Sequence, residues 1–315
     1  MAQPTNTFAT NDMAGIREDL SDVIYMISPS ETPFFNLVQH PEATAATHEW
    51  QTDSLAAAAN NAVIEGDDVT ADASTPTTRL TNITQLSDKS ARVTSRGRSV
   101  NTAGRSDELI YQIELKRAVE LRRDVETALL SNKAKVVGND TTAPELAGIG
   151  AWIATNDDFG TGGASPAGAD GSAARTDGTQ RAFTEAQLKA VLKSTFDNGG
   201  FPDVLMVGAF NRQIASSFAA GGTKFQRAED STLHATFSVY ESDFGDLRII
   251  PNRFQRGRDA LVLETDKWAV PILQDFHSFD LAKTGHSDAR VVAVEYTLEA
   301  RNEAASGGVF DLTIA

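Results

Sequence analysis

The sequence predicts an α+β fold in which extended segments precede a long helix and a mixed region of helices and strands. Residues 18–78 are acidic, residues 106–135 follow a helical pattern, and short helices and strands alternate from about residue 183. The acidic segment is also poor in apolar residues between positions 41 and 76, so it cannot bury enough surface to form a core of its own. We therefore expect it to become ordered against a neighbouring copy of the chain.

Charge is distributed unevenly along the first third of the chain. No Lys or Arg occurs between Glu18 and Thr78, and the basic residues that follow begin with Arg79 and Lys89. Opposite charges on facing segments attract, so the acidic segment is expected to lie against a basic one, in the same copy or in a neighbour. Its acidic residues are Glu18, Asp19, Asp22, Glu31, Glu42, Glu49, Asp53, Glu65, Asp67, Asp68 and Asp72.

The composition excludes several classes of protein. A chain of 315 residues can form one elaborate domain or two smaller ones. Its formal net charge of −15 argues against binding nucleic acid through phosphates, and the absence of cysteine excludes disulfides, thiolate zinc sites and cysteine nucleophiles. No apolar run approaches the roughly 20 residues that span a bilayer, and no signal peptide pattern opens the chain. We expect synthesis in a cytoplasm and no membrane partner.

The first segment is predicted to be a polar tail that leads into a short helix. Ile16, Leu20, Ile24 and Ile27 recur at helical spacing, which predicts a short amphipathic helix. A Ser-Pro-Ser sequence follows and ends this helix, because the residue before a proline avoids the helical region.

An apolar sequence at 33–38 comes next and contains Phe34 and Phe35. It can dock on the core of its own chain or on another copy, and the sequence leaves both open.

Two alternating segments predict an extended β flap. Side chains alternate at 44–53, with Trp50 on one face and Glu49 on the other, which indicates a strand. A second alternating pattern at 91–99 places Arg92, Arg96 and Arg98 on one face. An acidic and a basic strand predict a two-stranded flap, in which each facing pair of charges contributes about 0.2–1 kcal/mol. The sequence does not decide whether the flap pairs with itself or with another subunit.

The clearest helix is predicted over residues 106–135, with Ser106 as its N-cap. At 1.5 Å per residue this helix would be about 45 Å long. It carries Arg122 and Arg123, and a Gly-Asn sequence at 138–139 would end it. The Gly/Ala/Ser/Asp-rich residues 160–178 predict an exposed, flexible loop.

The rest of the chain alternates between helices and strands. Helices are predicted over 185–197 and 211–219. Strands are predicted over 204–207, 237–240, 247–250, 260–263 and 291–300. Four phenylalanines of this region are expected in the core, namely Phe196, Phe201, Phe210 and Phe218.

No constellation of residues predicts catalysis or a cofactor. The five histidines lack the spacing of a metal pair, and the Ser, His and Asp residues at 277–280 lie too close in sequence to assemble as a triad. The acidic turns at 65–68 and 157–158 are better explained by solvation than by a divalent cation. We therefore predict no enzyme, no metal and no cofactor.

The order of these parts resembles the major capsid proteins of tailed double-stranded DNA bacteriophages, which share the Hong Kong 97-type fold. The resemblance is greatest to the SU-ten-like branch of major head proteins and spans nearly the whole chain. Each motif is weak alone, and their number and order carry the resemblance. They are LSDVIY at 20–25, PSETPF at 29–34, WQTDSL at 50–55, ELIYQ at 108–112, RDVE at 123–126, DFG at 243–245, LAKTG at 281–285 and VEYTLE at 294–299.

The resemblance implies a division of the chain. The arm would be residues 1–45 and the extended flap, or E-loop, residues 46–100. A peripheral domain would cover 101–182, with the spine helix at 106–135 and the Gly-rich loop. The axial domain would cover 183–275, and C-terminal strands at 276–315 would return to the peripheral domain.

The resemblance also implies a structural function in a virion. Such proteins form hexamers and pentamers of an icosahedral head, assembled in the host bacterial cytoplasm, into which double-stranded DNA is pumped through a portal. A separate scaffolding protein and a decoration protein are further implied partners. The alternatives are an encapsulin-like compartment shell protein, a two-domain α/β hydrolase, and a tail or surface-layer component.

Subunit contacts are predicted where the acidic arm and flap would meet basic surfaces of a neighbour. The candidate residues are Phe34, Phe35, Glu49, Trp50, Asp53, Glu65, Asp67, Asp68, Arg92, Arg96, Arg98, Arg122 and Arg123.

Overall fold

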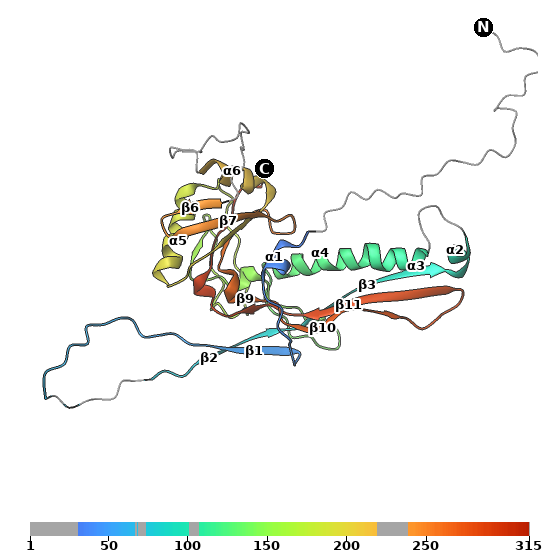
Figure 1. Cartoon of the computed structure of the whole chain (residues 1–315), viewed down its shortest axis with the longest axis horizontal. Coiled ribbons are helices and arrows are strands. Elements are labelled where there is room, and N and C mark those ends of the chain that lie inside the picture. Colours follow the sequence, from blue (N-terminus) through green and yellow to red (C-terminus); the bar gives the residue numbers. More distant parts are fainter. Residues whose placement is uncertain (1–30, 67, 69–73, 101–106, 219–238, 315) are drawn as a thin grey trace, which may run out of the picture.

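The computed structural model describes residues 31–66, 68, 74–100, 107–218 and 239–314. A long helix lies over a three-stranded sheet, and a six-stranded sheet with two helices stands at the other end of the molecule (Figure 1). We call these the long-helix part and the six-stranded part. The helix predicted near Ile16–Ile27 lies outside the described residues, as do Ser106 and Asp67.

The long helix is continuous from Glu108 to Leu129 and consists of α3 (Glu108–Ile110), the π-helical η2 (Tyr111–Arg117) and α4 (Ala118–Leu129). At 1.5 Å per residue it is about 33 Å long. Asp107 caps it, with its Oδ1 accepting a hydrogen bond from the backbone N–H of Leu109 at 2.9 Å.

The predicted bounds of 106–135 are therefore wrong at the C-terminal end. After Leu129 the backbone instead pairs with the return segment, since the N–H of Gly148 donates to Lys133 O and that of Gly150 to Ser131 O. A Cβ on Gly148 would lie 2.3 Å from Ser131 O, so only glycine permits this approach.

The three-stranded sheet has the order β10 (Ile272–Asp280), β11 (Ser287–Tyr296) and β3 (Gln85–Thr94), all antiparallel. The predicted basic strand at 91–99 is wrong beyond Thr94. The Thr94 side chain accepts a hydrogen bond from the N–H of Gly97 and caps a short helix, α2 (Ser95–Ser99), which carries Arg96 and Arg98.

The flap is built from β1 (Thr47–Thr52) and β2 (Thr78–Ile83), which pair antiparallel. The predicted alternation at 44–53 is confirmed, because His48, Trp50 and Thr52 are the less exposed residues of β1. The partner strand is β2, not the basic segment, because β3 takes β11 as its partner. The flap thus ends near Ile83 rather than at residue 100, and from here "the flap" means β1, β2 and the described residues 53–66, 68 and 74–77 between them.

The six-stranded sheet has the order β4 (Asp157–Asp158), β13 (Gly307–Val309), β8 (Ala260–Leu263), β5 (Val204–Val207), β7 (Gly245–Pro251), β6 (Val239–Ser242). Helices α5 (Glu185–Asp197) and α6 (Ala209–Phe218) contribute to the core on one face, with Leu205 and Val207 of β5. The other face, with Val204 and Met206, joins the core under the long helix.

Strands β5 and β8 cover the predicted residues 204–207 and 260–263, which confirms these two predictions. Helix α5 covers the predicted residues, and Thr184 forms a full capping box with Gln187.

The prediction that all of residues 276–315 return to the long-helix part is wrong, because β13 pairs with β8 and β4 inside the six-stranded sheet.

The predicted loop at 160–178 contains no helix or long strand, but it is not free. The fully buried Arg175 side chain donates to Asp259 Oδ1 at 2.9 Å and stacks 3.6 Å from the Phe310 ring centroid. This buried ion pair fixes the loop to the six-stranded part.

The expected core position of three phenylalanines is wrong. Phe196, Phe201 and Phe210 are 44%, 63% and 37% exposed, whereas Phe218 packs 4.8 Å from Phe183. α5 turns Phe196 outward at its C-terminal end because the buried side of the helix is occupied by Leu188, Val191 and Leu192.

The remaining elements are short, and within the described residues no helix is long and apolar enough to cross a membrane. They are α1 (Pro33–Leu37), η3 (Ile149–Ala151), η5 (Thr265–Lys267), β9 (Trp268–Ala269), β12 (Glu299–Ala300) and η6 (Glu303–Ala305).

Candidate subunit-contact surfaces

The base of the flap is fastened to the body of its own chain. Trp50 Nε1 donates a hydrogen bond to Ala300 O at 2.9 Å, and the Trp50 ring lies 5.3 Å from that of Trp152. His48 Nε2 lies 3.2 Å from Glu299 Oε2. Trp50, predicted as a subunit contact, is therefore half-buried against its own chain and fixes the direction in which the flap leaves.

Beyond this base the flap exposes large apolar side chains. It projects from the body in Figure 1, and Leu55, Val63 and Ile64 are 99%, 83% and 80% exposed. Two strands alone are at best marginally stable in water, and exposed apolar groups gain free energy when they are covered. The flap thus carries an apolar surface that its own chain leaves uncovered.

The acidic residues predicted on the flap lie at its surface. Glu49, Asp53, Glu65 and Asp68 are exposed, and Glu49 lies 3.4 Å from Arg79 across the strand pair. Asp67 lies outside the described residues. Sequence reasoning found these charges and missed the three apolar side chains between them, because isolated apolar residues in a polar segment follow no period.

Phe34 and Phe35 pack inside their own chain, which corrects their assignment as subunit contacts. Phe34 is 1% exposed and Phe35 is 9% exposed. The buried Glu126 carboxylate of α4 accepts hydrogen bonds from the Phe34 N–H at 2.7 Å and the Phe35 N–H at 2.9 Å. It also accepts one from Asn252 Nδ2 at 2.6 Å.

Glu126 therefore joins three parts of the chain: α1, the long helix and the loop after β7. Burial raises the pKa of Glu126 above its ordinary value, although the hydrogen bonds from Phe35, Phe34 and Asn252 oppose this shift. Nothing in the sequence marked this glutamate, because a single acid on a helix face is usually solvated.

The predicted arginines divide into two groups. Arg98 donates to Asp107 Oδ2 at 2.8 Å and to Asp288 Oδ2 at 2.9 Å, which raises the pKa of Arg98. Arg123 lies 5.3 Å from the Phe254 ring centroid. Both are thus engaged within their own chain.

The second group faces outward. Arg92, Arg96 and Arg122 are exposed, and no ion pair to them occurs within the described part of the chain. Arg122 lies 5.8 Å from the Phe35 ring centroid and donates to Asn36 Oδ1 at 3.4 Å. Arg122 is thus exposed but also contacts its own chain, whereas Arg92 and Arg96 are exposed without an ion pair among the described residues.

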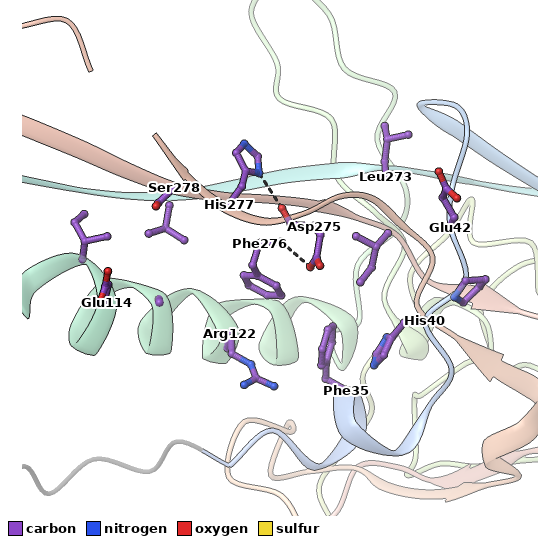
Figure 2. Close-up of a pocket in the computed structure, with 15 residues that line it drawn as sticks. Phe35, His40, Glu42, Glu114, Arg122, Leu273, Asp275, Phe276, His277 and Ser278 are labelled. Carbon is purple, nitrogen blue, oxygen red and sulfur yellow. Dashed lines mark hydrogen bonds between the residues drawn. The ribbon is translucent and has the colours of Figure 1, made fainter. Parts of the chain in front are cut away.

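A groove of about 850 Å³ opens between the long helix, the chain after α1 and β10 (Figure 2). The Phe35 ring stacks on His40 with centroids 4.2 Å apart, and the Phe276 ring meets Phe35 edge-on at 6.2 Å. Charged side chains such as Glu114 and Arg122 line the same groove. Among the described residues, no group of three His, Asp or Glu side chains is placed to hold a metal ion.

The comparison with protein families identifies the family of the chain that carries these surfaces. The model of the SU10 major capsid protein matches residues 3–313. The chain belongs to the SU10 major capsid protein family. The function of this family is structural, since its members form the capsid of a phage virion.

Individual relatives agree with this family. The chain is similar to the major capsid protein of Escherichia phage Phieco32, with 26% identity and 98% of both chains covered. It is also similar to a chain of the cyanophage A-1(L) capsid asymmetric unit, with a TM-score of 0.64, 13% identity, and 97% and 98% coverage. A chain from Mycobacterium phage Bobi gives a TM-score of 0.62 at 13% identity, with 96% and 98% coverage.

These comparisons confirm the predicted α+β fold of the Hong Kong 97 type and the function of a phage major capsid protein. They support neither the encapsulin-like compartment protein nor the hydrolase. For this SU10 family member, the exposed flap and the outward arginines are therefore surfaces of a capsid subunit.

Proposed function

We propose that copies of this chain form the hexamers and pentamers of an icosahedral head, and that the flap of each copy lies on the next copy. The proposal rests on one observation: the projecting flap exposes Leu55, Val63 and Ile64 almost completely. A protruding segment that contacts a different surface on its neighbour makes a heterologous contact, and such contacts form closed rings when the rotation between neighbours closes.

The apolar residues supply most of the proposed contact energy. Covering a Val, Leu or Ile side chain contributes about 1.5–3 kcal/mol. An exposed ion pair contributes only about 0–1 kcal/mol and weakens with salt. The acids Glu49, Asp53 and Glu65 of the flap, facing Arg92, Arg96 or Arg122 of a neighbour, would therefore direct the contact more than strengthen it.

The names of the family's parts follow from this proposal. We assign the peripheral domain to the long-helix part and the axial domain to the six-stranded part. We restrict the arm to residues before Thr32, because Phe34 and Phe35 are buried and donate their N–H groups to Glu126, so the chain from α1 onward belongs to the body.

The remaining partners are proposals of the same kind. We propose assembly in the host bacterial cytoplasm with a separate scaffolding protein, a portal and a decoration protein. The head would enclose double-stranded DNA without binding it by sequence, since a chain of net charge −15 does not favour phosphate contacts. The function is structural rather than catalytic.

Electron microscopy of the expressed chain tests this proposal. The chain is produced in bacteria, with and without a co-expressed scaffolding protein and portal protein, and the particles are imaged. We expect closed shells with fivefold and sixfold clusters of subunits. Tubes, flat sheets, or only monomers and small oligomers in both preparations would contradict it.

A further inference from the structure

Lys135 lies beside the root of the flap, in the segment that follows the long helix. We call residues 48–50 of β1 and 80–82 of β2, which face each other across the strand pair, the flap root. Trp50 fastens the β1 side of this root to the body. On the β2 side, Lys135 Nζ donates hydrogen bonds to Thr81 O at 2.8 Å and to Thr81 Oγ1 at 3.1 Å. The two strands of the root are thus held by different contacts.

The ammonium group of Lys135 is fully used. Its third hydrogen bond goes to Asp170 O, in the loop at 160–178, at 3.0 Å. An ammonium group has three donors, and here an oxygen acceptor is present for each of them. The backbone N–H of Lys135 also donates to Gly171 O at 2.9 Å. The half-buried Lys135 side chain therefore joins β2 to the loop at 160–178.

The loop at 160–178 gives this contact a fixed support. Asn132 Nδ2 donates to Arg175 O at 2.8 Å, and Asn132 Oδ1 accepts from the Arg175 N–H at 2.9 Å. The Arg175 side chain in turn pairs with Asp259 of the six-stranded part. Gly171 packs so closely on Trp152 that a Cβ would lie 2.8 Å from Trp152 Cζ2. The backbone oxygen that Lys135 binds is therefore fixed relative to the body.

Asn82 holds β2 one residue nearer the body. It is fully buried, its Nδ2 donates to Leu298 O at 2.7 Å, and its Oδ1 accepts from the Ala147 N–H at 2.9 Å. Trp50 and Asn82 thus attach the strands where they enter the body, whereas Lys135 holds β2 from the side of the loop. A two-stranded ribbon is at best marginally stable by itself, so its direction depends on such contacts.

We propose that Lys135 is a positioning residue for the flap, which sets the direction in which the flap leaves the body by fastening β2 to the loop at 160–178. The inference rests on the proposed function, in which the flap of one copy lies on the next. A flap that already points in one direction loses less conformational freedom when it binds, so the contact between copies is stronger.

Distances between two spin labels test this role in unassembled full-length chains. The chain contains no cysteine, so Gln51→Cys on β1 and Lys193→Cys on α5, both at exposed positions, place two labels without background. We expect one narrow distribution of distances when Lys135 is present. Lys135→Met keeps an unbranched side chain and removes its three donors, and we expect it to broaden or shift that distribution.

Lys133→Met is the matched control. Lys133 belongs to the same segment, pairs with Glu145 at 3.1 Å and is 62% exposed. This variant should leave the distribution unchanged, and urea unfolding should show that both Met variants are folded. An unchanged narrow distribution in folded Lys135→Met would overturn the inference. Equal broadening by Lys133→Met would also overturn it, because the effect would then follow the loss of a charge rather than of this contact.

Thr81→Val covers the case in which Lys135→Met does not fold. Valine has the shape of threonine and lacks the Oγ1 acceptor, so Lys135 keeps only its two backbone acceptors. We expect a broadening smaller than that caused by Lys135→Met. A folded Thr81→Val chain with an unchanged distribution refutes the positioning role.

Shell formation separates this inference from the proposed function. The distances are measured before copies meet, so they do not depend on assembly. We expect fewer closed shells from Lys135→Met than from Lys133→Met. Normal shells from a variant whose flap has lost its direction would count against the proposed role of the flap in assembly, whereas the distances would still support the positioning role of Lys135.

Discussion

Shell formation is expected to be lost when Leu55, Val63 and Ile64 are all replaced by Ser. These side chains are 80–99% exposed, so the fold of the isolated subunit should change little, with unfolding free energy within about 0.5 kcal/mol per substitution. In a shell, each substitution removes the burial of one apolar side chain at every contact, which contributes about 1.5–3 kcal/mol to the free energy of association. Because 1.4 kcal/mol is a tenfold change in affinity, even partial burial predicts at least about a hundredfold weaker contact.

The yield of shells in a density gradient, followed by microscopy, measures this effect, and urea unfolding of the subunit checks its fold. Val137→Ser is the matched control, since Val137 is 73% exposed but lies outside the flap. The control should assemble as the unchanged chain does. Normal shells from the triple variant would show that the flap residues are not a subunit contact.

Replacing Glu126 by Leu is expected to destabilise the subunit strongly. The substitution leaves the buried N–H groups of Phe34 and Phe35 and the amide of Asn252 without their acceptor. Each unpaired buried donor costs about 1–3 kcal/mol, so we expect a loss of at least about 3 kcal/mol in the unfolding free energy measured with urea. Glu114→Leu, at an exposed position of the same long helix, should have a much smaller effect.

Glu126 also predicts a pH dependence of stability. Burial raises its pKa in the folded subunit, so the folded state holds this proton more tightly than the unfolded state. Its contribution to stability is therefore greatest below the unfolded pKa, about 4.3, and is lost as the pH rises through the folded pKa.

Glu126→Gln removes this titration. As the pH rises from about 4 through the folded pKa of Glu126, the unfolding free energy of the unchanged chain should fall relative to that of the Glu126→Gln variant. A difference that stays constant over this range would contradict the assignment.

Local signals in the sequence predicted much of the fold. The helical pattern at 185–197 located α5, and the alternation around Trp50 located β1. The residues that define each of these elements lie close together in the sequence. Their patterns can therefore be recognised without knowing the fold.

Long-range packing explains what the sequence did not predict. The helix ends at Leu129 because the return segment at 148–150 takes the following backbone as its partner. The basic strand pairs with β11, which follows it by about 200 residues, and no local pattern identifies such a partner.

The candidate surfaces were predicted less completely than the fold. Charge identified the acidic flap, whereas apolar residues were assigned wrongly in both directions. Phe201 was expected in the core and is exposed, and Phe34 was predicted as a subunit contact and is buried by its own chain. A sequence cannot separate an apolar residue that a chain covers itself from one that a neighbour covers, because both follow the same preference for burial.

Cryo-electron microscopy of the assembled shell tests the central claim most directly, by locating residues 53–66 of the flap. The account predicts that Leu55, Val63 and Ile64 are buried against the body of a neighbouring copy. A closed shell in which these side chains face solvent, or fold back onto their own subunit, would contradict it.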